Sequence, residues 1–330
     1  MDGSVEACRY GTIRNYRTDE RVQMTDTRLP VRRLGRTGLM VTRLGYGAMS
    51  LDNGRLTPVT ADQAESVLST ALDAGINYID SSPDYGDSEE LLGRYISHRR
   101  DEFFIATKCG CPVAPSAGDR HVYNRENIEA AVEQSLRRLR TDYIDVLQFH
   151  GDPSREVLDR GDAIEALRDL QRAGKVRFIG VSGTLPNLPN QIAMDVFDVF
   201  QIPYSVLQRD HSDVISEAAQ AGAGTVIRGG AVRGGPSPEK EWAVRRLPEV
   251  EPERPRTLWE RANLDELLDG TPRMEWVLRY TFSHPDLDTT IVGTANASHL
   301  LANVAALQKG PLPPDVLAEA ARRLDAVEAG

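Results

Sequence analysis

Short apolar segments alternate with amphipathic ones along most of the chain. Each apolar segment is bounded by glycine or polar residues, which is typical of a buried strand. In the amphipathic segments, apolar residues recur at helical spacing, as Ile128, Val132 and Leu139 do within residues 125–139. Strands are predicted at residues 41–48, 76–82, 102–109, 143–150, 176–183, 199–205, 224–230 and 289–295.

This alternation predicts a parallel sheet covered by helices. Eight such units favour an α/β fold of the (β/α)8 TIM barrel type over a doubly wound sheet. Gly45 and Gly47 follow a strand as in a dinucleotide-binding fingerprint, but Ser50 occupies the third position and no helix begins there. We expect one barrel domain over residues 31–330, preceded by a disordered leader at residues 1–30.

Residues 231–258 form one long irregular segment that is rich in Pro, Glu and Arg. The segment follows the seventh predicted strand, so it should lie on the C-terminal side of the barrel, where active sites of such barrels are found. A segment of this length within a compact domain is typical of a mobile lid or of a disordered insertion. Both interpretations remain open.

Charge and cysteine content narrow the class of protein. The net charge of -10 and the pI near 5.2 argue against a basic surface for nucleic acid or anionic membrane. Neither a membrane-spanning run nor a signal peptide is predicted, and Met24 is an alternative start. Cys8, Cys109 and Cys111 make no disulfide framework, which indicates a reducing cytoplasm. Cys109 and Cys111 lack partner cysteines at zinc spacing, so no metal site is expected.

Three successive predicted strands end on ionisable residues: Asp80, Lys108 and His150. Tyr85 follows in the loop after the first of them. A single polar residue at a strand end is usually a cap, and a single loop tyrosine is usually packing. In a parallel barrel, however, these positions share one rim, so the four side chains are expected to converge in a site.

Proton transfer is the chemistry that this set of side chains fits. Tyrosine in water has a pKa of about 10, which is too high for efficient acid–base work near neutrality. A nearby Lys108 ammonium would lower the pKa of Tyr85, and Asp80 would hold Lys108 protonated. His150 would donate a hydrogen bond to a carbonyl oxygen, and Tyr85 would deliver a proton to that oxygen as hydride reaches the carbon.

From about residue 31 onward, the sequence resembles the aldo-keto reductases. The matching stretches are "RRLGRTGLMVTRLGYGAM", "INYIDSSPDYGDSEELLG", "FFIATKCG", "SLRRLRTDYIDVLQFH", "GKVRFIGVSG" and "QIPYS". The resemblance implies a TIM barrel that binds a nicotinamide cofactor without a Rossmann fold. It also places the catalytic Asp-Tyr-Lys-His tetrad of the family at Asp80, Tyr85, Lys108 and His150, with Tyr85 as general acid.

The resemblance also implies cofactor contacts at the nicotinamide end. Ser182 and Gln201 would hydrogen-bond the carboxamide, and Tyr204 would stack on the ring. Gly183 stands where the family usually has Asn, so one carboxamide contact would pass to backbone or water. The residues implied here are Gly47, Ala48, Met49, Asp80, Ser182, Gly183, Gln201 and Tyr204.

Further residues are implied for the pyrophosphate and adenosine ends. Glycines after the seventh strand would let backbone N–H groups approach the pyrophosphate, although a flexible loop is the alternative. We expect NADP(H) as the preferred cofactor, because the anion site of the fold and Arg228 or Arg233 remain. NAD(H) is the alternative, because His299 stands where NADP-preferring relatives carry Arg or Lys. The residues implied are Arg228, Gly229, Gly230, Arg233, Gly293, Thr294, His299 and Asn303.

The predicted activity is reduction of an aldehyde or ketone by NAD(P)H, or the reverse reaction. Two alternatives remain open: a cofactor-binding sensor or scaffold subunit, and an aldolase in which Lys108 forms a Schiff base. The partner is expected to be a small carbonyl or alcohol, without nucleic acid or membrane. Loop residues suggest a polyol or sugar-like substrate: Asp52, Asn53, Asp84, Asp87 and Asp152.

Overall fold

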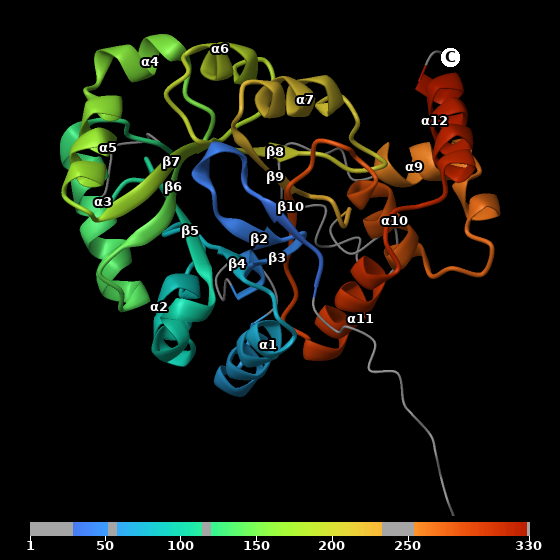
Figure 1. Ribbon diagram of the computed structural model, residues 1–330, viewed down its shortest axis with the longest axis horizontal. Helices are drawn as coiled ribbons and strands as arrows, with labels where there is room; N and C mark the ends of the chain where they lie inside the picture. The colour runs from blue at the N-terminus through green and yellow to red at the C-terminus, as the bar shows by residue number, and fades with distance from the viewer. Residues whose placement is uncertain (1–28, 52–57, 114–119, 233–253, 329–330) are drawn as a thin grey trace, which may run out of the picture.

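A closed barrel of parallel strands forms the centre of the computed structural model, which describes residues 29–51, 58–113, 120–232 and 254–328 (Figure 1). The strand order around the barrel is β10-β3-β4-β5-β6-β7-β8-β9, which confirms the predicted TIM barrel. The barrel strands are β3 (Leu44–Gly47), β4 (Tyr78–Asp80), β5 (Phe104–Cys109), β6 (Ile144–His150), β7 (Val176–Ser182), β8 (Val199–Pro203), β9 (Gly224–Arg228) and β10 (Thr289–Val292).

Helices surround the barrel (Figure 1). The α-helices are α1 (Ala61–Asp73), α2 (Ser88–Tyr95), α3 (Arg125–Leu139), α4 (Arg155–Arg160), α5 (Ala163–Arg172), α6 (Leu188–Ala193), α7 (Ser212–Gln220), α9 (Arg254–Arg261), α10 (Arg273–Phe282), α11 (Ala297–Gln308) and α12 (Pro314–Glu328). Short 3-10 helices are η1 (Gly35–Thr37), η2 (Ala48–Leu51), η3 (Ser97–Glu102) and η5 (Leu264–Leu267).

The helix boundaries follow from local sequence signals. Thr60 caps α1 in a reciprocal capping box, because its hydroxyl accepts from the Gln63 N–H while the Gln63 side chain accepts from the Thr60 N–H. Helix α3 occupies the predicted segment and buries its apolar face, including Ile128, Val132 and Leu139. These helices cover the strands from outside, so the barrel strands are buried on both faces.

An N-terminal antiparallel hairpin, β1 (Val31–Arg33) with β2 (Met40–Thr42), lies across one opening of the barrel (Figure 1). Leu34, Leu39 and Val41 pack with apolar side chains from the barrel strands, so they close the N-terminal end. Gly35 adopts a φ of +44°, and a Cβ there would lie 2.2 Å from the backbone nitrogen of Gly224. The opposite, C-terminal end of the barrel is therefore the end that can admit a ligand.

Strand register brings the predicted polar residues to that C-terminal rim. Parallel pairing aligns the last residues of successive strands, so their side chains converge although they are far apart along the chain. The pairs at the rim are Gly47 with Asp80, Lys108 with Gln148, His150 with Ser182, and Ser182 with Gln201.

Three sequence predictions need correction or restriction. The strand predicted at 41–48 is split, because Val41 and Thr42 belong to the hairpin and the barrel strand begins at Leu44. Of the predicted 1–30 leader, Leu29 is buried and Pro30 accepts a hydrogen bond from the Arg43 N–H, while residues 1–28 lie outside the described residues.

The irregular segment predicted at 231–258 also ends earlier than expected. Helix α9 begins at Arg254, so residues 254–258 are helical, and residues 233–253 lie outside the described part of the chain. Among the helices that the structure describes, each is too short or too polar to cross a lipid bilayer.

Candidate active site

A buried ion pair lies at the centre of the C-terminal rim. The Lys108 ammonium donates to Asp80 Oδ1 at 2.7 Å and to the backbone carbonyl of Ser81 at 2.7 Å. Asp80 and Lys108 are 2% and 1% exposed, so water does not screen their attraction. The ion pair connects the end of β4 to the end of β5, which confirms that these strand ends come together.

Two glutamines hold the second carboxylate oxygen of Asp80. Gln148 Nε2 donates to Oδ2 at 3.0 Å, and Gln201 Nε2 donates to the same oxygen at 2.8 Å. Gln201 Oε1 in turn accepts from the Ser182 hydroxyl at 2.7 Å. Ser182 and Gln201, predicted as the carboxamide contacts, thus bond to each other and fix Asp80, so they link the predicted cofactor site to the ion pair.

Tyr85 lies beside the ion pair, in the loop between β4 and α2. The Lys108 nitrogen is 4.9 Å from the centre of the half-buried Tyr85 ring. Burial would lower the pKa of Lys108, but the charges of Asp80 and Tyr85 and their hydrogen bonds raise it overall. Lys108 therefore remains an ammonium.

The pKa of Tyr85 shifts in the opposite direction from the sequence prediction. Burial raises it, and the charge of Asp80 adds to that increase, while Lys108 and Arg228 lower it. The net pKa is raised, so the predicted depression by Lys108 is present but is outweighed by desolvation. Tyr85 is consequently a protonated phenol at neutral pH, which is the form that donates a proton.

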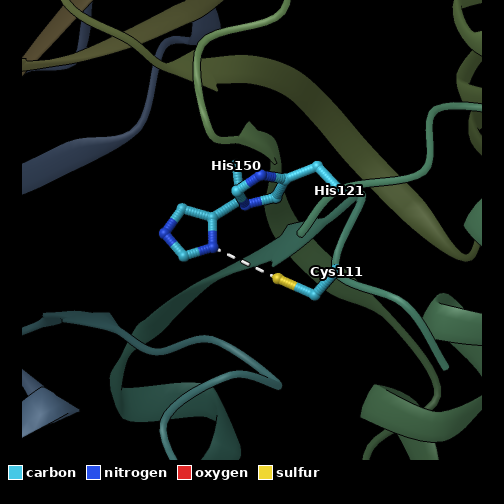
Figure 2. Close-up of side chains that lie close together, drawn as sticks. All are labelled: Cys111, His121 and His150. Carbon is cyan, nitrogen blue, oxygen red and sulfur yellow. Dashed lines mark hydrogen bonds between the residues drawn. The ribbon is translucent and has the colours of Figure 1, made fainter. Parts of the chain in front are cut away.

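His150 completes the predicted tetrad from the end of β6. Its ring lies edge-on to Tyr85, with centroids 6.1 Å apart and an interplanar angle of 89°. Its Nδ1 lies 3.2 Å from Cys111 Sγ (Figure 2), and its backbone carbonyl accepts a hydrogen bond from the Tyr123 hydroxyl. The contact with Cys111 engages Nδ1, the ring nitrogen on the Cys111 side.

The thiol of Cys111 stays protonated at neutral pH. Burial, followed by the charge of Asp84, raises its pKa to about 11. A protonated thiol donates to Nδ1, which places the ring proton of a neutral His150 on Nε2. The contact therefore favours the tautomer of His150 that donates through Nε2.

The predicted cofactor residues line the same rim. Gly47 and Ala48 are buried at the end of β3 and the start of η2, and Met49 is 37% exposed. A Cβ on Gly293 would lie 2.6 Å from the Gly47 carbonyl oxygen, so glycine is needed where β10 meets β3. The Thr294 carbonyl accepts from the Tyr46 hydroxyl at 2.8 Å, which fixes this turn.

Arg228 and Tyr204 lie on neighbouring strand ends. The Tyr204 N–H donates to the Arg228 carbonyl at 3.1 Å. The Tyr204 ring is 7% exposed, stacks on Tyr280 at a centroid distance of 6.4 Å and lies edge-on to His284. Arg228 Nε is buried and lacks a hydrogen-bond partner among the described residues, as a group that binds an external anion would.

The loop after β9 leaves space in which a ligand could approach the backbone at Gly229. Gly229 has a φ of +75°, and a Cβ placed on it would have open space around it. Gly230 is packed instead, because a Cβ there would lie 2.7 Å from the Thr290 hydroxyl oxygen. Arg233 lies outside the described residues, as do Asp52 and Asn53.

Gly183 has a packing reason for departing from the family pattern. A Cβ at this position would lie 2.9 Å from Gln191 Oε1 and 3.1 Å from Asp152 Oδ1. Asp152 is held there by the Asn187 amide and the Thr184 N–H, at 3.0 and 3.3 Å. The side chains of Asp152 and Gln191 therefore occupy the space that an asparagine at position 183 would need.

Helix α11 presents its N-terminus near the end of β10, as the sequence predicted. Its first N–H groups are capped, because Asn296 Oδ1 accepts from Ser298 and His299 at 2.8 and 3.2 Å. The His299 side chain is exposed, whereas Asn303 is 4% exposed within the helix. His299 is thus accessible to a ligand at the adenosine end, and Asn303 is not.

Sequence reasoning missed three residues of this site. Gln148 shares the inner face of β6 with His150, and that two-residue spacing is the signal that would have found it. Cys111 and His121 reach His150 only through the folded loop after β5, so their spacing along the chain carried no signal.

Comparison with known proteins identifies the family. The model of the aldo/keto reductase family matches residues 43–324, and the chain belongs to this family. L-Galactose dehydrogenase from Arabidopsis thaliana is 29% identical over 85% of this chain and 89% of its own length. The NADH-specific methylglyoxal reductase of Escherichia coli is 29% identical over 53% of this chain and 59% of its own length.

The solved structures agree with the family assignment. The holo form of an aldo-keto reductase from Bacillus halodurans superimposes with a TM-score of 0.75 and is 28% identical, covering 89% of this chain and 96% of its own. The family and its oxidoreductase relatives support a carbonyl-reducing oxidoreductase that uses a nicotinamide cofactor.

Proposed function

We propose that the protein reduces an aldehyde or ketone to an alcohol with a reduced nicotinamide cofactor, or catalyses the reverse oxidation. The observation that carries this proposal is the buried Asp80–Lys108 pair, with the protonated Tyr85 beside it and His150 facing Tyr85. This set provides one proton donor, one fixed positive charge and one hydrogen-bond donor around a common space.

Each side chain has a distinct role in the proposed reaction. When bound, a reduced nicotinamide supplies the hydride that reaches the carbonyl carbon. His150 donates from Nε2 to the carbonyl oxygen and orients it. Tyr85 transfers its phenolic proton to that oxygen, and the adjacent Lys108 ammonium stabilises the resulting phenolate. Asp80, held by Gln148 and Gln201, keeps Lys108 charged and in place.

The residues present fit a nicotinamide dinucleotide. Arg228 Nε, which has no hydrogen-bond partner within the described part of the chain, and the open space at Gly229 suit a pyrophosphate. The amide of Gln201 and the hydroxyl of Ser182 suit a carboxamide. We propose that NADPH binds more tightly than NADH by only about tenfold, or ~1.4 kcal/mol, because His299 is not an arginine. Fluorescence titration with both cofactors tests this, and an NADH preference, as in the Escherichia coli relative, contradicts it.

A sugar-like aldehyde is the proposed substrate class. L-Galactose dehydrogenase is a relative that matches most of the chain, and polar residues flank the site here. We propose that Asp84, whose charge acts on Cys111 beside His150, contacts substrate hydroxyls. Asp152 is hydrogen-bonded to Asn187 and Gln191.

The Schiff-base aldolase is disfavoured by the state of Lys108. A nucleophilic lysine needs a lowered pKa, but the charges of Asp80 and Tyr85 raise that of Lys108 against the effect of burial. A sensor or scaffold would bind the same cofactor as the proposed reductase but would not turn over a substrate. Neither alternative has an observation in its favour.

The experiment is a panel of aldoses and simple aldehydes, assayed with NADH and NADPH by the absorbance of the reduced nicotinamide. Turnover that Tyr85→Phe abolishes supports the reductase, and cofactor binding without turnover on any substrate supports the sensor. Borohydride trapping of a substrate on Lys108 would overturn the proposal in favour of the aldolase.

A further inference from the structure

Two histidines and one cysteine converge at the edge of the proposed active site. Cys111, His121 and His150 each present one ligand atom, and these atoms lie within 4.8 Å of one another (Figure 2). They come from three separate places: Cys111 lies just after β5, His121 lies in the loop before α3, and His150 is the last residue of β6. The sequence prediction of no metal site considered only the spacing of the cysteines. It did not include His121 and His150, which the fold brings next to Cys111.

Packing and hydrogen bonding hold the two histidines of the cluster in place. The His121 ring stacks on Tyr123 at 5.9 Å with an interplanar angle of 12°. It also rests on Gly151, where a Cβ would lie 2.3 Å from the ring. The His121 and His150 rings are edge-on at 5.4 Å, and the His150 carbonyl is fixed by the Tyr123 hydroxyl. Tyr123 therefore supports the cluster in two ways, with its ring against His121 and with its hydroxyl on the backbone of His150.

The exposure and charge of the cluster suit a cation from solvent. Cys111 is 8% exposed, whereas His121 and His150 are half-buried, so an ion has access from the histidine side. The Asp84 carboxylate acts electrostatically on both Cys111 and His121. Lys108 and Arg120 oppose a cation, but the charge of Lys108 is already balanced by Asp80.

We propose that Cys111, His121 and His150 form a binding site for a thiophilic divalent cation, specifically Zn²⁺. One thiolate and two imidazoles are a ligand set that Zn²⁺ prefers, and three protein ligands leave the fourth tetrahedral position for water. Zinc–ligand bonds of about 2.0–2.3 Å require nitrogen and sulfur ligand atoms roughly 3.3–3.6 Å apart in a tetrahedron with one thiolate. The 3.2 Å separation of Cys111 Sγ and His150 Nδ1 is close to this. The His121 ligand atom lies within 4.8 Å of the other two, so it would move by up to about 1.4 Å.

Binding releases the thiol proton of Cys111 to solvent, and the sulfur and two ring nitrogens donate their lone pairs to the ion. The bound ion holds the His150 ring through Nδ1, so the ring can no longer adjust its position to a carbonyl oxygen. Because a misplacement of about 1 Å in a reacting group slows turnover by roughly a hundredfold, we expect Zn²⁺ to inhibit turnover. This consequence, though not the binding itself, rests on the proposed carbonyl reduction.

The test is a binding measurement on the full-length, reduced and chelator-treated protein. Zn²⁺ is titrated in competition with a chelating dye, and Co²⁺ is added separately as a spectroscopic probe. We expect one Zn²⁺ per chain and a thiolate-to-cobalt charge-transfer band. His121→Phe keeps the stacking on Tyr123 but has no ligand atom, and we expect it to weaken Zn²⁺ binding by at least about a hundredfold. Cys111→Ala is expected to abolish the cobalt band.

Matched controls separate this site from adventitious binding. His98→Phe removes an exposed histidine, and Cys8→Ser removes the cysteine outside the described residues, so both should bind Zn²⁺ as the unaltered protein does. Equal affinity in His121→Phe and in the unaltered protein would overturn the proposal, as would a cobalt band that survives Cys111→Ala.

Binding is read without turnover, so it stands or fails independently of the proposed reductase activity. Where turnover is found, we expect Zn²⁺ to inhibit the unaltered protein, a chelator to restore it, and His121→Phe to resist inhibition. Unchanged turnover at saturating Zn²⁺ would overturn the inhibitory role.

Discussion

Two buried carboxylates at opposite ends of the barrel show how similar ion pairs serve different purposes. Asp145, near the start of β6, accepts from Arg100 and Arg177 at 2.6 Å each and from the Ile105 N–H at 2.9 Å. Asp80, at the end of β4, accepts from Lys108 and two glutamines. Their side chains are 1% and 2% exposed, so burial alone does not distinguish the two.

The two ion pairs differ in their cations and in their place in the barrel. The guanidinium of Arg100 lies 4.2 Å from the centre of the Tyr143 ring, and its side chain is 14% exposed. Arg100 and Arg177 together balance the charge of Asp145. Lys108 is a point charge, and the ionisable Tyr85 ring lies 4.9 Å from its nitrogen. Both cations thus lie beside a tyrosine ring, and what separates the two ion pairs is their place in the barrel. The Asp145 cluster is at the N-terminal face, which serves stability in such barrels, whereas the Asp80–Lys108 pair shares the C-terminal rim with His150.

The largest expected effect comes from Tyr85→Phe, which removes one hydroxyl from the C-terminal cluster. The chemical step should slow by about 10²- to 10⁴-fold, the contribution of a general acid. The ring remains, so thermal stability and cofactor affinity should change little. Single-turnover reduction and fluorescence titration of the cofactor measure the two quantities, and wild-type rates in this variant would return Tyr85 to a packing role.

Lys108→Met sharpens the same point, because it should reduce both turnover and stability. The substitution leaves Asp80 as an unpaired buried carboxylate, which costs about 3–5 kcal/mol. The phenolate formed by Tyr85 also loses its adjacent positive charge. A variant that lost stability but kept its rate would show that Lys108 is structural only, like the arginines around Asp145. Denaturant unfolding with steady-state kinetics separates these outcomes.

Asp145→Asn tests the other half of the comparison. It leaves Arg100 without its buried carboxylate, and we expect a loss of about 3 kcal/mol, the lower end for a broken buried pair because both arginines retain contact with solvent. Turnover per folded molecule should be unchanged. Arg177→Gln is the control, with a loss of at most about 1 kcal/mol, because its side chain is 43% exposed. Altered turnover in Asp145→Asn would contradict the view that the N-terminal face serves stability and the C-terminal face serves catalysis.

Strand ends were the features that sequence reasoning could locate, and this explains which parts of the site it found. Asp80, Lys108 and His150 each close an apolar run, so the fold class alone brings them to one rim. The direction of the Tyr85 pKa was wrong, because its charged neighbours are visible in the sequence and its desolvation is not. Cys111 and His121 were missed for a similar reason, since loop folding alone brings them to His150.

Gly183→Asn tests whether the rim loop tolerates the residue that the family usually has. The asparagine would collide with Gln191 and Asp152, so we expect overpacking to cost about 1–3 kcal/mol. Gly174→Asn is the matched control, because its φ of +74° suits asparagine and a Cβ there meets open space. Thermal unfolding compares the two, and equal stability would mean that Asp152 and Gln191 move aside readily.

The smallest effect concerns Glu89, a third buried carboxylate that resembles neither of the others. Its Oε1 accepts from the Thr107 hydroxyl at 2.7 Å, but its Oε2 is 3.6 Å from Arg138 and lacks a hydrogen-bond partner among the described residues. Burial raises the pKa of Glu89, against the opposing effects of Thr107, Ser135 and Arg138. The negative charge of Glu89 is thus only partly compensated by donors, whereas those of Asp80 and Asp145 are fully compensated.

The sign of its pH dependence follows from that shift. The folded state holds the Glu89 proton more tightly than the unfolded chain does, so stability falls as the pH rises from about 4.3, the ordinary value for glutamate, through the raised pKa in the folded state. Glu89→Gln lacks this fall and should be more stable than the unaltered protein at pH 7 by about 0.5–1.5 kcal/mol. The advantage should vanish below about pH 4. Glu90→Gln, at the exposed neighbouring position, should show no such trend, and a destabilised Glu89→Gln at pH 7 would mean that the Arg138 contact compensates the charge after all.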